Sequence, residues 1–417
     1  MKDLKHKKAL LAPEDGESAA PSSPCSSVSQ KTKSRSTVRA VQILLVLAAL
    51  QYPIIGYCDS GSGWLKNLFG STGKNMKNVA IKVTELPEKY NINVQGLDFS
   101  PNGKFLAVRS ADEFINIWDW QAGRIARTVE KAQGAEDGLT TEPMRYSPDG
   151  RLFAACHERA VNNILARIWN TDTWQVAHDI VDALPGGCRA IGFTPDGKSL
   201  LRISHRNHNF PADDFIVYDV DTWRPQWGLR TWPFYPNALA ISPDGKFAAL
   251  GGEVIVPGPI PDKQQIVIVD LAKHAIVNTI PDTVSFSFGR LAWSPDGAYL
   301  AAIGHRAWDG AANHGQGAYV GGPDTFMVFD AHSGKQVTAG QWGELGQLSL
   351  RYTPDGKYLI EGDVNDKGTG LGARIWDSQH RELLQTIPGN VGSLAVSKDG
   401  RFLAIGSDKK TTIWQLK

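Results

Sequence analysis

Six histidine and acidic residues recur at a nearly constant offset from a repeated glycine turn, and they are the most chemically suggestive residues of this chain. Each follows its turn glycine by seven or eight residues: His157, His205, Glu253, His305, Asp363 and Asp408. Further polar and aromatic residues lie close to them in sequence: His208, Trp232, Phe234, Tyr235, Trp308, Asp309, His314 and Trp342. Imidazole and carboxylate groups ligate metals, whereas exposed aromatic groups anchor protein interfaces. The set therefore defines one candidate binding surface.

Two functions are open for this surface. One is a metal or small-ligand site, in an exported enzyme or ligand-binding protein. The other is docking of a protein or peptide. Residues at equal positions of neighbouring repeats stand several ångströms apart, which is more than a tight metal shell tolerates. We therefore favour docking and expect no metal, cofactor or catalytic residue. Some of these residues also suit β-turns, as Ser407-Asp408 does.

No segment shows a recognisable catalytic pattern. The glycine-rich stretch Gly310–Gly322 lacks a Gly-Lys-Ser/Thr ending, so it is not a phosphate-binding loop. No Ser-His-Asp spacing and no pair of carboxylates stands out. We predict that the protein is not an enzyme.

A seven-residue phrase positions these residues, and it occurs seven times. It reads apolar, small or polar, aromatic or aliphatic, Ser or Thr, Pro, Asp or Asn, Gly, with Lys once in place of Pro. The glycines are 47, 47, 48, 52, 59 and 44 residues apart, and the phrases end at Gly103, Gly150, Gly197, Gly245, Gly297, Gly356 and Gly400. Such a period is typical of repeat architectures.

Each phrase begins a predicted β-meander. Leu97 and Phe99 alternate with Asp98, which is strand periodicity, and Pro-Asp-Gly then supplies the turn. A second apolar run follows, then a third that ends in a motif such as Ile117-Trp118-Asp119, then in most units a fourth. Four strands in each of seven units predict an all-β fold, a seven-bladed β-propeller.

These residues resemble the WD-repeat β-propeller family over Val79–Lys417. The Trp-Asp or Trp-Asn ending is intact at Trp118, Trp169 and Trp376, whereas the Gly-His pair that opens many family repeats is missing. The resemblance implies a rigid propeller that binds a protein or peptide partner.

The connections between strands predict two unlike faces. Short Pro-Asp-Gly turns, and turns such as Asp172-Thr173, share one face. The opposite face receives long connections: Glu130–Thr141, Arg206–Asp214, Arg230–Asn237, Val256–Lys263, Arg306–Asp324, Gly340–Gln347 and Asn365–Gly372. Because loops on a rigid scaffold carry function more often than the scaffold does, we expect binding on the second face, which also bears the candidate residues.

The first 78 residues differ from the rest. Residues 1–39 are rich in Ser, Pro and Lys, which predicts a disordered basic tail, and 59–78 reads as a linker. Between them, 40–58 forms one hydrophobic helix that is a transmembrane anchor, a signal segment cleaved near Cys58 with lipidation as one variant, or a buried segment. The basic residues before it place the propeller on the extracytoplasmic side, membrane-anchored or, after cleavage, periplasmic.

Two further expectations concern the propeller domain, 79–417. Residues 79–86 read as a lone strand that pairs with Thr411–Trp414 and closes the ring, giving a monomer. After Asn78 the chain carries 33 basic and 38 acidic residues, which argues against nucleic acid as its partner.

Two cysteines fall at corresponding heights in neighbouring repeats. Cys156 lies six residues after one turn glycine, and Cys188 lies nine before the next. A disulfide would require an oxidising compartment. Buried free thiols are the alternative, and we favour them because the sequence does not fix the direction of either side chain.

Overall fold

The structure, a computed structural model, describes the propeller without most of its longer connections. It covers residues 77–87, 94–110, 114–129, 144–161, 164–181, 186–206, 214–254, 263–281, 286–306, 325–341, 347–363, 372–379, 381–407 and 410–417. All strands belong to the unit Gly73–Lys417. Within the described ranges no helix could span a membrane. The predicted tail at 1–39, the hydrophobic helix at 40–58 and all but the end of the 59–78 linker lie outside them.

The strands form seven antiparallel sheets of four, which we number as blades. Blades 1 to 3 contain β2 (Val94–Phe99), β3 (Phe105–Ser110), β4 (Ile115–Asp119) and β5 (Arg124–Val129); β6 (Met144–Tyr146), β7 (Leu152–Val161), β8 (Ile164–Asn170) and β9 (Val176–Val181); and β10 (Gly186–Phe193), β11 (Ser199–Arg206), β12 (Phe215–Asp219) and β13 (Pro225–Leu229). Blades 4 and 5 contain β14 (Phe234–Ile241), β15 (Phe247–Val254), β16 (Lys263–Asp270) and β17 (Ala275–Pro281); and β18 (Phe286–Trp293), β19 (Tyr299–Arg306), β20 (Thr325–Asp330) and β21 (Gln336–Gln341). Blades 6 and 7 contain β22 (Gln347–Tyr352), β23 (Tyr358–Asp363), β24 (Ala373–Asp377) and β25 (Leu383–Ile387); and β26 (Val391–Val396), β27 (Phe402–Ser407), β28 (Lys410–Leu416) and β1 (Ala80–Glu85).

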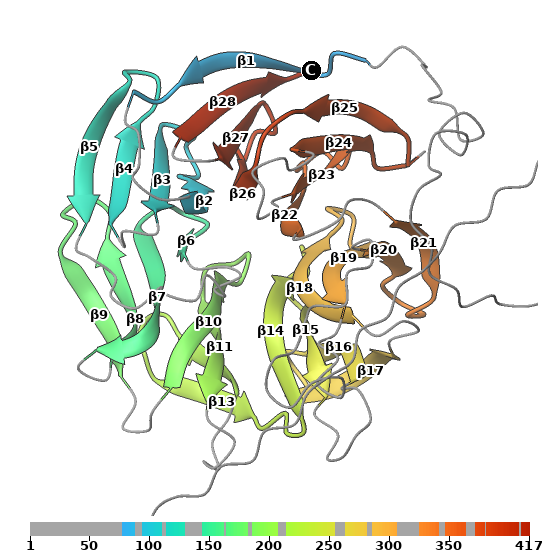
Figure 1. Cartoon of the computed structure of the whole chain (residues 1–417). Helices are drawn as coiled ribbons and strands as arrows, with labels where there is room; N and C mark the ends of the chain where they lie inside the picture. The colour runs from blue at the N-terminus through green and yellow to red at the C-terminus, as the bar shows by residue number, and fades with distance from the viewer. Residues whose placement is uncertain are drawn as a thin grey trace, which may run out of the picture. The chain divides into compact units, whose positions relative to one another are not determined.

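The blades form a closed ring. Figure 1 shows β2, β6, β10, β14, β18, β22 and β26 around the centre and the last strand of each sheet at the rim. Each innermost strand contacts the next, and the contact between β26 and β2 joins the last blade to the first. The prediction of an all-β, seven-bladed propeller is confirmed.

The core is divided into seven hydrophobic clusters, one between each pair of neighbouring blades. Strand alternation produces this division, because successive side chains point to opposite faces of a sheet. In β3, Leu106 packs toward blade 7 and Ala107 packs toward blade 2. Each blade is therefore buried on both faces only when both of its neighbours are present.

The phrase in each repeat closes its hairpin with a fixed set of hydrogen bonds. In blade 2, Ser147 Oγ donates to Asp149 Oδ1 at 2.6 Å, and the same oxygen accepts the Arg151 backbone N–H at 3.0 Å. Gly150 has a φ of 76°, in the left-handed region that favours glycine. The Ser/Thr-to-Asp or Ser-to-Asn bond recurs in the other repeats at Ser100–Asn102, Thr194–Asp196, Ser242–Asp244, Ser294–Asp296, Thr353–Asp355 and Ser397–Asp399.

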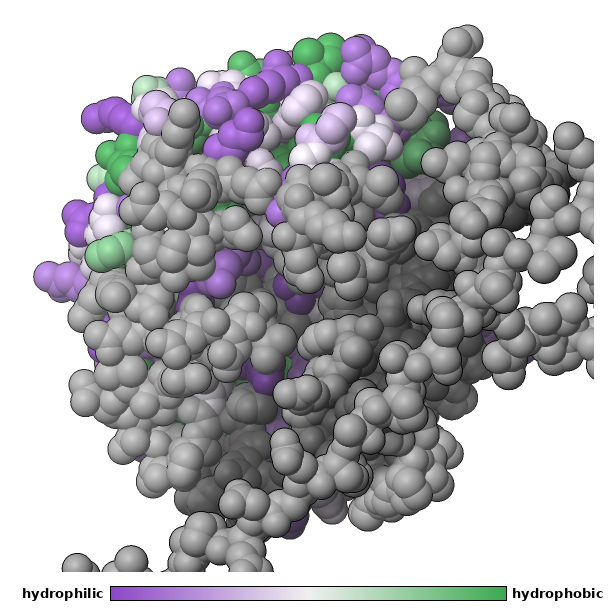
Figure 2. Space-filling model, viewed as in Figure 1, coloured by the Kyte–Doolittle hydropathy of each residue, from purple (hydrophilic) through white to green (hydrophobic). Residues whose placement is uncertain are grey.

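β1 supplies the fourth strand of blade 7. It pairs antiparallel with β28, with Ala80 opposite Leu416. The side chain of Gln385 in blade 6 holds the same strand: Ala80 N–H donates to its Oε1 at 2.7 Å, and its Nε2 donates to Ala80 O at 3.0 Å. The strand that precedes blade 1 is thereby fastened to blades 6 and 7. Figure 2 shows hydrophilic and hydrophobic residues interspersed along this edge.

Candidate functional site

The two ends of the strands define two faces of the propeller. We call the face with the Pro-Asp-Gly turns and the turns between the third and fourth strands the turn face. The opposite face, where second strands end and innermost strands begin, is the loop face. It receives the long connections 130–143, 207–213, 255–262, 307–324, 342–346 and 364–371, all outside the described residues.

The backbone places several candidate residues at one level of the loop face. His205 pairs with Gly187, Glu253 with Tyr235 and His305 with Ser287. In each pair the partner is the second residue of an innermost strand. The predicted equal height therefore holds at backbone level across the consecutive blades 3, 4 and 5. Asp363 pairs with Gln347, the first residue of β22.

Four candidates have described side chains, and they differ in exposure. Trp232 is 48% exposed, and its ring meets that of Tyr235 edge-on at a centroid distance of 5.5 Å. Phe234 is 3% exposed and belongs to the cluster between blades 3 and 4, so it supports the loop face from beneath. His157 is buried and lies in the middle of β7, so the prediction that it stands at the end of its strand was wrong. Trp232 and Tyr235 are thus the described aromatic pair on this face.

The other candidates fall outside the description in whole or in part. His208, Trp308, Asp309, His314, Trp342 and Asp408 lie in the undescribed connections. For His205, Glu253, His305 and Asp363 the backbone alone is described. That these residues together form a binding surface therefore remains a prediction.

A disulfide joins Cys156 of β7 to Cys188 of β10, with their Cα atoms 5.1 Å apart, so the preference for free thiols was wrong. A β-bulge between Cys188 and Ala190 explains the pairing. The bulge shifts the strand alternation, so Cys188 and Ile191 both face blade 2 while Ala190 faces blade 4. The sequence gives no sign of this bulge, so the direction of Cys188 could not be predicted.

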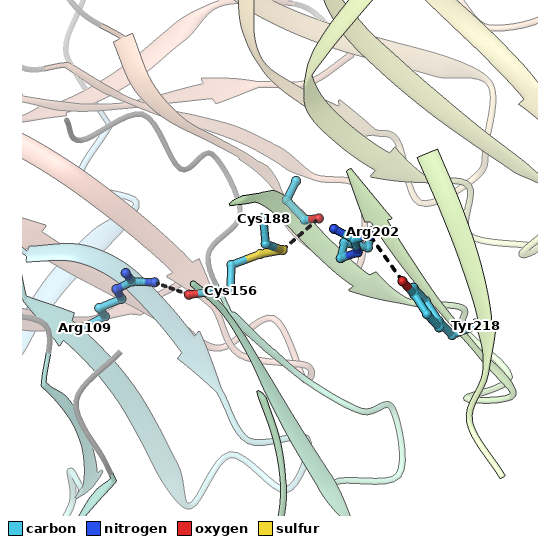
Figure 3. The surroundings of a disulfide bond; sticks show 6 residues. Arg109, Cys156, Cys188, Arg202 and Tyr218 are labelled. Atoms are coloured by element: carbon cyan, nitrogen blue, oxygen red, sulfur yellow. Dashed lines mark hydrogen bonds between the residues drawn. A yellow bond between two sulfur atoms is a disulfide. The ribbon is translucent and has the colours of Figure 1, made fainter. Parts of the chain in front are cut away.

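The disulfide lies in a buried contact that extends over three blades, as Figure 3 shows. Arg109 of blade 1 is fully buried, and its Nη1 donates to the carbonyl oxygen of Cys156 at 3.1 Å. In blade 3, Arg202 Nη2 donates to the Tyr218 hydroxyl at 3.2 Å. A covalent bond and a buried charged donor thus bind blades 1, 2 and 3 to one another.

The described residues also form cavities on the turn face. A cavity of about 840 Å³ lies between blades 4 and 5, with Phe247, Trp293 and the carboxylates of Asp244 and Asp296 in its wall. A cavity of about 310 Å³ lies at the centre of the ring. The serine hydroxyl of its own turn holds the pKa of Asp296 below its usual range, so this group is a carboxylate at neutral pH.

Comparison with known proteins identifies the repeats. The family model "WD domain, G-beta repeat" matches residues 83–119 and 381–415. Protein hir1 of Aspergillus terreus (strain NIH 2624 / FGSC A1156) is 21% identical over 255 residues, 54% of this chain and 23% of that protein. SEC12-like protein 1 of Arabidopsis thaliana is 26% identical over 202 residues, 47% of this chain and 46% of that protein. The match therefore spans less than half of either relative. Together, the two matched repeats and the closed ring of seven four-stranded blades support the resemblance of this chain to the WD-repeat β-propeller family.

Proposed function

We propose that this propeller is a protein-interaction scaffold that works outside the cytoplasm, tethered to a membrane or exported. The observation that carries the proposal is the closed ring of WD-type repeats, an architecture typical of interaction scaffolds. Such a ring is rigid because every blade packs on two others, and it holds the strand ends from which the connections leave in fixed positions. The chain acts by binding and not by catalysis, as a monomer with a protein or peptide partner.

The loop face is the proposed docking surface. It carries the predicted candidate residues, and the exposed Trp232 against Tyr235 supports it. Tryptophan and tyrosine are enriched among the residues that dominate interface energies, because each buries a large area at low entropic cost. A peptide or a protein loop that covers Trp232 would gain this contribution.

The disulfide supports the proposed location. Disulfides persist in oxidising compartments and are rare in the cytosol. The Cys156–Cys188 bond therefore favours a propeller outside the cytoplasm. The basic residues that precede the apolar segment 40–57 favour the same orientation under the positive-inside rule. Anchoring by that segment and release after its cleavage both agree with these observations.

Shortening 306–324 to a tight turn tests the docking surface. The variant should lose capture of the partner from solubilised membranes, while its melting temperature stays nearly unchanged, because a long surface loop adds little to ring closure. The matched control is the double substitution Asp172→Ala and Thr173→Ala on the turn face, which should alter neither property. Capture that survives the shortened loop but fails in the control would move the docking surface to the turn face.

A further inference from the structure

The innermost strands carry an unusual balance of charge. Among their described residues the charged side chains are four arginines and one aspartate: Arg145, Arg189, Arg290, Arg351 and Asp98. The strands that surround the centre of the ring are thus strongly cationic, although the whole propeller sequence has more acidic than basic residues. This concentration of positive charge lies away from the loop face proposed for docking, and it belongs to residues that our sequence prediction did not select.

Three of these arginines interact across the centre. Burial and the charge of Arg351 lower the pKa of Arg145 to about 10, and burial and Arg351 lower that of Arg290 to about 9. Arg145 lies in blade 2, whereas Arg290 and Arg351 lie in blades 5 and 6. Blades 2 and 6 are not neighbours in the ring, so the charges of Arg145 and Arg351 act on each other across its centre. With these values, Arg145 and Arg290 are cationic at neutral pH.

Asp98 is the one acidic side chain among the described residues of the innermost strands. Its Oδ1 is 3.9 Å from Arg145 Nη1, and its Oδ2 accepts the Tyr146 backbone N–H at 2.7 Å. Burial raises the pKa of Asp98, and the charge of Arg145 counteracts this. Arg290 and Arg351 each donate to the carbonyl of the preceding residue on their own strand, Gly289 and Leu350.

The central cavity lies between two of these arginines. Arg145 and Arg351 occupy the second position of the repeated phrase in blades 2 and 6, and both line the cavity. In the three blades between them that position is held by small residues, which also line it: Gly192, Ala240 and Ala292. The short side chains leave a space of about 310 Å³, with Ile241 and Trp293 in its wall. This combination of apolar wall and few placed polar groups is characteristic of small-molecule sites.

We propose that the central cavity binds a small organic anion, with a carboxylate or phosphate head against Arg145 and Arg351 and a short apolar body against Ile241 and Trp293. A planar guanidinium presents paired donors that match the oxygens of either head group. Both arginines are partly buried, so the attraction is less weakened by water than it would be on an open surface. An anion would also relieve the mutual repulsion of the three arginines. The site opens on the turn face and is independent of docking on the loop face.

Titration calorimetry of the full-length chain tests the proposal, with benzoate, phenyl phosphate and neutral benzamide as probes at constant ionic strength. At least one anion should bind with one site per chain, and benzamide should not bind. Benzoate and phenyl phosphate separate the two head groups, because binding of one alone assigns the site to carboxylates or to phosphates. If neither anion binds, the proposal is wrong.

Two kinds of variant locate the binding. Arg351→Gln should lower the affinity for the anion by at least about tenfold, the effect expected for loss of a charge-assisted pair. Ala292→Leu fills the cavity without changing its charge and should also abolish binding. Arg401→Gln removes an exposed charge from the same face and should change affinity by less than about twofold. Circular dichroism confirms that each variant is folded. Anion binding that persists at full strength in both cavity variants would place it elsewhere and overturn the assignment.

Discussion

At the scale of single residues, the carboxylates of the repeated turns share a lowered pKa. Hydrogen bonds from Thr194 and Ser294 lower the pKa of Asp196 and of Asp296. Burial raises the pKa of Asp149, but donors from Ser147 and Arg151 outweigh it and leave the pKa at about 2. Each lowered pKa means that folding favours the ionised form of that aspartate, so the turns link stability to pH.

We therefore predict that the propeller loses stability in acid. An aspartate has a pKa of about 3.9 in the unfolded chain, so the unfolded form takes up protons first as the pH falls. The stabilisation is complete above that value and is lost as the pH falls from about 4 toward the folded value, about 2 for Asp149. Thermal melts between neutral pH and pH 3 measure this. Asp149→Asn should lower the melting temperature at neutral pH and flatten the acid slope, whereas a slope unchanged by Asp149→Asn but altered by the control Asp172→Asn would contradict the argument.

The tryptophans at the ends of the third strands hold neighbouring blades together. Trp118 packs toward blade 7, Trp169 toward blade 1 and Trp376 toward blade 5. Replacement of any one by Ala should cost roughly 3–5 kcal/mol of unfolding free energy, the usual loss for a buried large aromatic. Denaturant melts measure this loss. Trp232→Ala is the control, and because Trp232 is half-exposed we expect a change of less than about 1 kcal/mol. Equal midpoints for all four variants would show that the blades do not depend on these rings.

Sequence patterns predicted the burial of these tryptophans but not the position of Arg145 and Arg351 at the central cavity, and the reason is physical. The position of Trp118 repeats in strand after strand, so its burial follows from local alternation. Arg145 and Arg351 share their position in the phrase with Gly192, Ala240 and Ala292, and the pattern therefore reads only as small or polar. Arg145 and Arg351 come to line the same cavity only when the ring closes and brings blades 2 and 6 to opposite sides of it.

At the scale of elements, the strands of the meander could be predicted well because each hairpin specifies itself. The glycine and aspartate of each turn fix the register of the first two strands, and apolar alternation fixes the next. The sequences of the connections on the loop face show no such repeated pattern. The candidate residues on strand ends, such as His205 and His305, acquire a defined level from their backbone pairing, whereas 307–324 lies outside the described residues.

β1 is the element on which closure depends, and we predict that it is indispensable. The chain shortened to residues 79–417 should be folded and soluble. The chain shortened to 87–417 loses β1, which exposes the backbone edge of β28 and opens the clusters that contain Val79, Ala80 and Leu86. It should aggregate or melt at a much lower temperature, as measured by calorimetry and light scattering. Identical cooperative melting of the two chains would refute the role of β1.

At the scale of the whole molecule, the proposed export of the propeller can be tested from both ends of the chain. We predict that the tail stays in the cytoplasm and the propeller is exported, because basic residues precede the apolar segment 40–57. Protease added to cells with a permeabilised outer layer should digest or release the propeller while a cytoplasmic marker stays intact. An export-dependent reporter fused after Lys417 should be active. A protected propeller and an inactive reporter would reverse the proposed topology.

The pairing of β1 with β28 also affects how the chain can fold while it is being synthesised. Ala80 is held by Gln385, a residue 305 positions later in the chain, and by the strand that follows still further on. At about 5–20 residues per second, ribosomes need roughly 15 s to a minute to make that interval. During this time β1 has no strand to pair with. The blades already synthesised also expose the apolar faces that blades 6 and 7 will later cover. We therefore expect a newly made chain to need protection from aggregation until its last strand has been made.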